Sequence, residues 1–106
     1  MKRRVLIAEP DADVRAFLEL TVRRLGYEVV AEGDDADAVL LEPGCAVGRS
    51  VVRRLGADAP PVVCLSIYPR EDGLEPPASV AYLTKPATSH QIGNALRGAV
   101  AVQPAY

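Results

Sequence analysis

The sequence predicts a single doubly wound α/β domain, in which helices cover both faces of a parallel sheet. Short apolar runs without alternation, such as Val5–Ala8 and Val62–Leu65, are typical of strands that are buried on both faces. Between such runs lie segments whose apolar residues recur every three or four positions, as on one face of a helix. With 106 residues, the chain is long enough for one compact domain and too short for two.

The first helix is expected directly after the first strand. Asp11 or Asp13 can cap it, because a short carboxylate accepts hydrogen bonds from the N–H groups of a helix's first turn. Gly26 is the expected end, since glycine readily adopts the left-handed conformation that follows a helix. The apolar stripe of this helix is made of Val14, Phe17, Leu18, Val22 and Leu25.

Further strands are predicted at residues 27–31, 36–41 and 80–83, and the strand that begins at Val62 ends at Ser66. A second helix is indicated by four apolar residues at helical spacing before Gly56. These residues are Val47, Val51, Val52 and Leu55. The last helix begins at a capping box, Thr88-x-x-Gln91. Its apolar stripe consists of Ile92, Ala95, Leu96, Ala99 and Val100.

Two connections depart from this alternation of strands and helices. Only residues 32–36 join the second and third strands, whereas a crossover helix needs about a dozen residues or more. Either this link is an extended loop, or the two strands are not parallel neighbours. Residues 68–78 are rich in Pro, Gly and charge, which predicts a loop with at most one helical turn. We expect the domain to occupy residues 1–102 and residues 103–106 to form a frayed tail.

Composition excludes several classes of protein. Hydrophobic residues make up 49% and charged residues 25%, as in ordinary globular domains, and the net charge of −2 does not favour nucleic-acid binding. No apolar run approaches the roughly 20 residues that span a membrane, and the one after the basic start is too short for a signal peptide. Cys45 and Cys64 are expected to be reduced thiols in a cytoplasmic protein.

Polar residues gather where the predicted strands end. In open α/β sheets, ligands bind in the crevice beyond the carboxyl ends of the strands. The residues at these ends are Glu9, Pro10, Asp11, Glu42, Ser66 and Lys85. The sequence therefore predicts one site that combines carboxylates, a hydroxyl group and a lysine.

Four motifs in this order resemble response-regulator receiver (CheY-like) domains over nearly the whole chain. They are VLIAEPDADVR at 5–15, ADAVLLEPG at 36–44, PVVCLS at 61–66 and YLTKP at 82–86. Each motif alone is weak, and their order at successive strand ends carries the resemblance. It implies a flavodoxin-like sheet of order 2-1-3-4-5, with reduced helices between strands 2 and 3 and between strands 4 and 5. It also implies a role in two-component signal transduction.

The resemblance also implies residue roles. Glu42 stands where the family has an aspartate that accepts a phosphoryl group, and Glu9 and Pro10 stand where it has two acidic residues that bind Mg²⁺. Pro10 has no carboxylate, and Glu42 is one methylene longer than aspartate, whereas Mg²⁺ demands near-octahedral oxygen geometry. We therefore expect no Mg²⁺ or other cofactor. Glu9, Asp11 and Glu42 are the set that would bind the metal, although Asp11 is better placed to cap the helix.

The remaining matches lie at the last two strand ends. Ser66 and Lys85 match residues that contact the phosphoryl group, and Tyr82 matches an aromatic switch residue. Each also has a structural interpretation, since Ser66 can tie down a loop and Tyr82 can belong to the core. With no phosphoryl group, Glu42 and Lys85 can form a direct ion pair.

These departures favour a receiver that is not an enzyme and acts as a phosphorylation-independent protein-interaction module. Its expected partner is another protein or a second copy, bound by the last helix, the fifth strand and residues 68–78; nucleic acid and membrane are not expected. One alternative is a working phosphoacceptor in a phosphorelay. Another is a small-ligand-binding flavodoxin-like domain, although no Gly-rich phosphate loop follows the first strand.

Overall fold

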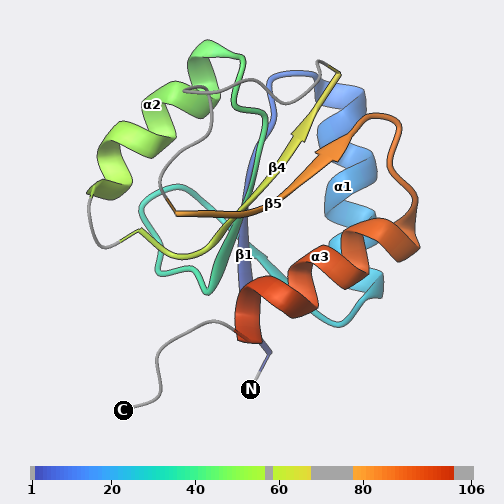
Figure 1. Ribbon diagram of the computed structural model, residues 1–106. Coiled ribbons are helices and arrows are strands. Elements are labelled where there is room, and N and C mark those ends of the chain that lie inside the picture. The colour runs from blue at the N-terminus through green and yellow to red at the C-terminus, as the bar shows by residue number, and fades with distance from the viewer. Residues whose placement is uncertain (1, 57–58, 68–77, 102–106) are drawn as a thin grey trace.

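The computed structural model describes residues 2–56, 59–67 and 78–101. Their strands form one parallel sheet of order β2-β1-β3-β4-β5 (Figure 1), which confirms the predicted fold class and strand order. The strands are β1 (Arg4–Ala8), β2 (Glu28–Val30), β3 (Ala38–Leu41), β4 (Val62–Ser66) and β5 (Ser79–Thr84). The helices are α1 (Ala12–Arg24), α2 (Ala46–Leu55) and α3 (Ser89–Ala101).

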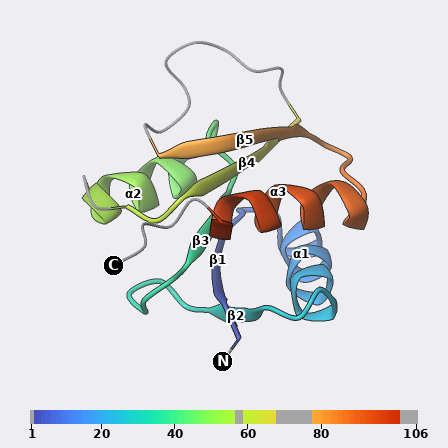
Figure 2. The ribbon, with the colours of Figure 1, turned by 60° about the horizontal axis from the view of Figure 1, so that its bottom comes forward.

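Helices lie on both faces of the sheet. Helices α1 and α3 cover one face and α2 covers the other (Figures 1 and 2). The buried side chains accordingly form two clusters. One includes Leu18 of α1 and Leu96 of α3, and the other includes Val51 of α2. Strands β1, β3 and β4 contribute to both clusters, which explains why their sequences show no polar alternation.

The capping signals are confirmed. Asp11, and not Asp13, caps α1, where its Oδ1 accepts hydrogen bonds from the backbone N–H groups of residues 13 and 14 at 2.9 and 3.0 Å. Gly26 has a φ of 96° after the end of α1. Thr88 and Gln91 form the reciprocal capping box, since each side chain accepts a hydrogen bond from the other residue's backbone N–H, at 2.8 and 3.1 Å.

The predicted apolar stripes were wrong at two positions. Phe17 is 48% exposed and Val47 is also exposed. Neighbouring residues on a helix point about 100° apart, so Phe17 lies on the flank of α1 when Leu18 points into the sheet. Val47 lies in the first turn of α2, whereas Val51, one turn later, is buried. Helical spacing alone therefore overestimated the width of the buried face.

Both explanations that the sequence offered for the short link between β2 and β3 hold, since the link is a loop without a helix and the two strands are not neighbours in the sheet. Both strands pair in parallel with β1 on opposite sides, so that Val5 faces Val29 of β2 and Ala38 of β3. Residues 31–37 make this connection without a helix. They can do so because β2 has only three residues and is about 10 Å long at 3.3 Å per residue. The loop therefore has only a short distance to cover from the carboxyl end of β2 back to the start of β3.

Several expectations lie partly or wholly outside the described residues, namely most of the loop at 68–78 and the tail at 103–106. Strands β2 and β3 are shorter than predicted, at three and four residues. No helix in the described part of the chain has the length and apolar character needed to cross a membrane.

Candidate functional site

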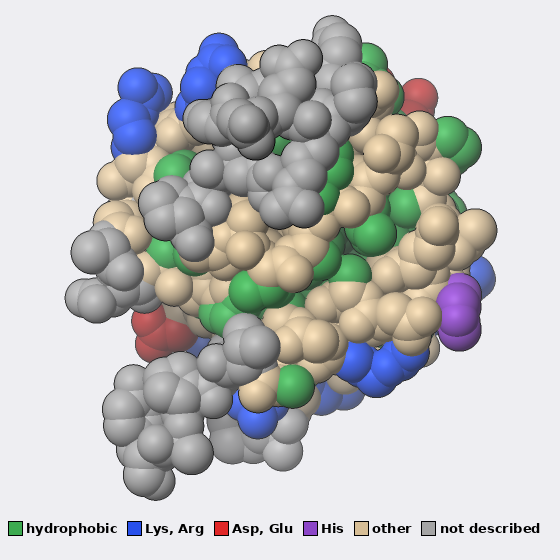
Figure 3. Space-filling view, in the orientation of Figure 1, with side chains coloured by type: hydrophobic (Ala, Val, Ile, Leu, Met, Phe, Trp, Pro, Cys, Tyr) green, Lys and Arg blue, Asp and Glu red, His purple; other side chains and the backbone are tan. Residues whose placement is uncertain are grey.

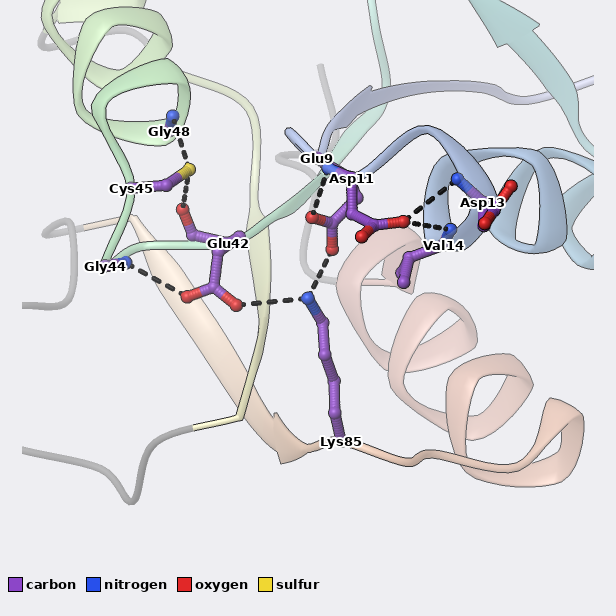
Figure 4. Close-up of polar contacts among 9 residues, drawn as sticks. All are labelled: Glu9, Asp11, Asp13, Val14, Glu42, Gly44, Cys45, Gly48 and Lys85. Carbon is purple, nitrogen blue, oxygen red and sulfur yellow. Dashed lines mark hydrogen bonds and ion pairs between the residues drawn. The ribbon is translucent and has the colours of Figure 1, made fainter.

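An acid–lysine cluster lies beyond the carboxyl ends of three strands. The Nζ atom of Lys85, just after β5, hydrogen-bonds Oε1 of Glu9, just after β1, and lies 3.2 Å from Oε2 of Glu42, just after β3. Figure 4 shows the lysine side chain reaching up between the two carboxylates. Because β1 and β3 are neighbours and β5 is the edge strand, the long lysine side chain bridges the distance that the strand order leaves.

Each carboxylate also accepts one backbone hydrogen bond. The N–H of Asp11 donates to Oε2 of Glu9 at 3.2 Å, and the N–H of Gly44 donates to Oε1 of Glu42 at 3.1 Å. Both glutamates are buried, and a buried carboxylate is costly unless it is paired and hydrogen-bonded. Each of their four oxygens therefore has a donor, which explains how two acidic groups are tolerated in one buried site.

The start of α2 packs directly on Glu42. The thiol of Cys45 donates a hydrogen bond to the backbone oxygen of Glu42, and its sulfur accepts one from the N–H of Gly48, both at 3.2 Å (Figure 4). A Cβ atom at Gly48 would lie 2.0 Å from that same oxygen. Only glycine permits this approach, so α2 holds the main chain of Glu42 in place from one side.

Lys85 is charged at neutral pH. Burial lowers the pKa of its ammonium, but hydrogen bonds and charge interactions with Glu9 and Glu42 outweigh that effect, so its pKa lies above the usual 10.5. Its side chain is only 15% exposed, and water therefore screens these interactions weakly. One ammonium between two carboxylates leaves the cluster with one net negative charge.

The other predicted site residues lie around this cluster but play different parts. The carboxylate of Asp11 caps α1 and is exposed, as the sequence favoured. Ser66 is buried at the end of β4, where its backbone oxygen accepts a hydrogen bond from the N–H of Lys85 at 2.7 Å. Tyr82 is half-buried and packs against the core cluster beneath α2. The Lys85–Pro86 peptide bond is cis.

Sequence reasoning anticipated the ion pair of Glu42 with Lys85 but missed three features. It did not predict that Glu9 shares the same ammonium, nor that Cys45 caps α2, nor that Gly48 touches the backbone of Glu42. Gly48, a glycine inside the predicted helical pattern, was a signal for a close approach of backbone to backbone.

The chain was compared with protein-family models, curated proteins and solved structures. No protein-family model matches the chain. The transcriptional regulatory protein PdtaR of Mycobacterium tuberculosis is 36% identical over 102 residues, an alignment that covers 79% of this chain and 50% of PdtaR. The chain thus spans about half the length of the curated relatives it matches.

Solved structures share the fold. A CheY-like response-regulator receiver protein from Methanospirillum hungatei superposes with a TM-score of 0.80 at 15% identity, covering 95% of each chain. The receiver domain of a sensor histidine kinase from Pseudomonas aeruginosa, which has a magnesium ion coordinated in its active-site cleft, gives a TM-score of 0.75 at 17% identity. That match covers 95% of this chain and 99% of the other.

Fold and strand order define the class, which is a five-stranded α/β domain with a site at the carboxyl ends of its strands. The structural likeness establishes this fold, and the sequence similarity to PdtaR supports a relationship to receiver domains. The chain has the fold of CheY-like response-regulator receiver domains, and over 79% of its length its sequence is similar to part of the regulatory protein PdtaR.

As arranged, the residues at this site are not suited to bind a magnesium ion like the one in the Pseudomonas receiver domain. The ammonium of Lys85 binds both Glu9 and Glu42, and Asp11 turns its carboxylate to the N–H groups of α1. Pro10 contributes no side-chain oxygen. Among the described residues, no group of three or more acidic, histidine or cysteine side chains is arranged to hold a metal ion.

Proposed function

We propose that the chain acts in signal transduction as a protein-interaction module that does not require phosphorylation and that is not an enzyme. One observation carries this proposal: the ammonium of Lys85 is bonded to Glu9 and Glu42 at once. By resemblance to the family, Glu42 stands at the phosphoacceptor position, and Lys85 is the residue that would contact the phosphoryl group. Here the ammonium of Lys85 already has a carboxylate partner where the phosphoryl group would lie.

The chemistry of phosphoryl transfer also supports a silent site. A carboxylate oxygen of Glu42 would have to attack phosphorus in line with the leaving group, yet one oxygen bonds Lys85 and the other bonds the N–H of Gly44. An error of about 1 Å in such a reaction can cost about 100-fold in rate. The extra methylene of glutamate shifts the attacking oxygen by more than that. Without a carboxylate at position 10, the site also lacks one ligand for the Mg²⁺ ion that would neutralise the negative charge on the phosphoryl oxygens.

A surface for a protein partner lies on β5 and α3. Hydrophobic side chains gather in a band over these two elements (Figure 3). Val80 is exposed on β5, which is the edge strand of the sheet and can pair with or pack against another chain. We propose that a partner covers this face. Cys45 and Cys64 form no disulfide, which fits a reducing cytoplasm.

Intact-mass measurement after incubation with Mg²⁺ and a small phosphodonor tests the silent site. We expect no added phosphoryl mass on the natural sequence, and none on Glu42→Asp, because Pro10 still withholds a ligand. The double variant Pro10→Asp with Glu42→Asp restores the family's acidic residue at both positions and serves as the positive control. A stable phosphoryl mass on the natural sequence that disappears in Glu42→Gln would refute the proposal.

A working phosphoacceptor is the second candidate, because the similar Pseudomonas receiver binds magnesium in its cleft. Under that alternative, Glu9, Asp11 and Glu42 would bind the metal after Lys85 has moved away. A melting temperature measured with Mg²⁺, with and without a beryllofluoride mimic of the phosphoryl group, separates the two. A saturable rise would favour the phosphoacceptor, and an unchanged melting temperature would favour the silent module.

A further inference from the structure

Helix α1 carries an exposed strip that its packing on the sheet does not use. Asp13, Phe17, Leu20 and Arg24 follow at spacings of three and four residues, which places them on one side of the helix. All four are exposed, and Phe17 and Leu20 are each 48% exposed. Single exposed apolar residues are ordinary, but two on successive turns with a charge beyond each end form an organised surface. We call these four residues the α1 strip.

The order of residues in the α1 strip makes it complementary to itself. Asp13 and Arg24 lie at equal distances from one point midway along α1, and Phe17 and Leu20 lie at equal distances from that same point. If a second α1 packs antiparallel about this point, Asp13 comes opposite Arg24 of the second copy. In the same register, Phe17 comes opposite Leu20. One arrangement therefore satisfies both charges and both apolar residues.

The charges of the strip are available for this contact. Among the described residues, Asp13 and Arg24 form no ion pair, whereas the neighbouring Glu19 pairs with both Arg15 and Arg23 on its own helix. Three other charges on α1, those of Arg15, Glu19 and Arg23, are thus engaged within the helix, with one carboxylate between two guanidinium groups. The two at the ends of the strip are left to act on another molecule.

A hollow beside Phe17 offers room for a side chain of the second copy. It measures about 540 Å³ and is bordered by apolar groups that include Ile67, Pro86 and Ala87. Ile67 is itself exposed and extends the apolar surface beyond the helix. An apolar centre with charged ends is the usual anatomy of a protein interface.

We propose that two copies of this chain form a symmetric dimer through antiparallel packing of their α1 strips. A two-fold axis makes each contact occur twice, so the dimer contains two pairs of Asp13 with Arg24 and an apolar centre of two Phe17 and two Leu20. The charge pairs set the antiparallel register, and the apolar residues supply contact area. The inference rests on the proposed interaction role and adds a second surface, on α1, whose partner is another copy of the chain. It does not depend on what covers the β5 and α3 face, nor on whether Glu42 is phosphorylated.

Sedimentation velocity over a range of protein concentrations tests the dimer. We expect the natural chain to dimerise and the double variant Phe17→Ser with Leu20→Ser to be monomeric at the same concentrations. Val80→Asp, on the β5 surface, is the matched control and should still dimerise. A natural chain that stays monomeric at all concentrations would overturn the proposal and leave the strip for a different protein. A dimer abolished by Val80→Asp but not by the Phe17 and Leu20 variant would overturn it as well.

Charge exchange tests the register. Asp13→Arg places Arg opposite Arg24 of the second copy, and Arg24→Asp places Asp opposite Asp13, so each variant alone should dimerise at least about tenfold more weakly. An equimolar mixture of the two should form heterodimers, because every facing pair is again oppositely charged. The double exchange should restore the homodimer. Circular dichroism confirms that each variant is folded, and a mixture that fails to associate would refute the antiparallel register. Phosphoryl mass is measured separately, so failure of either proposal can be told from failure of the other.

Discussion

Replacing Lys85 with methionine should destabilise the domain by about 3 kcal/mol at pH 7, because removing one partner of a buried charge cluster leaves the other partners uncompensated. Methionine retains the apolar length of the lysine chain and removes only its ammonium. Glu9 and Glu42 would then be two buried carboxylates on neighbouring strands with no cation between them.

The magnitude follows from the contacts that remain. Breaking a buried ion pair by removing one partner costs about 3–5 kcal/mol. The lower end applies here, because each carboxylate keeps one backbone hydrogen bond, from Asp11 to Glu9 and from Gly44 to Glu42. A domain of this size is stable by about 5–15 kcal/mol in total, so the loss would be a large part of its stability.

Urea unfolding followed by circular dichroism measures the effect, and a second substitution identifies its cause. Glu42→Gln removes one of the two uncompensated charges at nearly constant shape. In the Lys85→Met background this change should therefore recover about 1 kcal/mol or more, whereas in the natural sequence it should destabilise. The opposite signs are the signature of a charge cluster.

Two results would refute this reasoning. A loss of less than about 1 kcal/mol in Lys85→Met would mean that the ammonium does not stabilise the cluster. Strict additivity of Lys85→Met and Glu42→Gln would mean that the two side chains do not interact, contrary to the 3.2 Å separation of their charged atoms.

Three further predictions concern pH and the two helix starts. The pKa of Lys85 is higher in the folded chain than its usual 10.5, so the stability that its charge contributes is complete below pH 10.5 and is lost as the pH rises through the folded pKa. In urea unfolding between pH 9 and pH 12, the free energy of unfolding should therefore fall more steeply for the natural chain than for Lys85→Met. Gly48→Ala should destabilise the domain by about 2 kcal/mol or more, because its Cβ would meet the backbone oxygen of Glu42 at 2.0 Å. Gly98→Ala, on α3 with no atom within 4 Å of the new Cβ, should instead be neutral or stabilising by up to about 1 kcal/mol, and equal effects of the two alanines in thermal unfolding would contradict the close approach. Asp11→Ala should cost about 1 kcal/mol through loss of the cap of α1, Asp11→Asn should retain most of it, and a fully stable alanine variant would disprove the capping role.

The positions of the site residues were predictable to the level of the strand end. Buried apolar runs located the carboxyl ends of all five strands to within a residue, and parallel strands bring these ends to one edge of the sheet. This is why Glu9, Glu42, Ser66 and Lys85 were expected together. Which ends are neighbours depends on strand order, which came from the resemblance to receivers and not from the apolar runs themselves.

Contacts within the site were less predictable. That one ammonium serves both Glu9 and Glu42 depends on the reach of the lysine side chain across β4, a distance that sequence spacing does not contain. The exposure of Phe17 is a similar case. Helical periodicity ranks the faces of α1 by polarity, but the width of the face that is buried depends on what packs against it.

By itself, the sequence determined the succession of strands and helices, the caps of α1 and α3 and the kind of side chain at each strand end. These features depend on local backbone conformation and on whether a segment is apolar, both of which act over a few neighbouring residues. Only the tertiary structure decided that Lys85 pairs with two glutamates, that Gly48 supports Glu42 and that the α1 strip faces solvent. The contacts of Lys85 join residues far apart in the chain and exist only once the sheet has brought its strands together. The approach of Gly48 and the exposure of the strip depend on how α2 and α1 pack against the sheet.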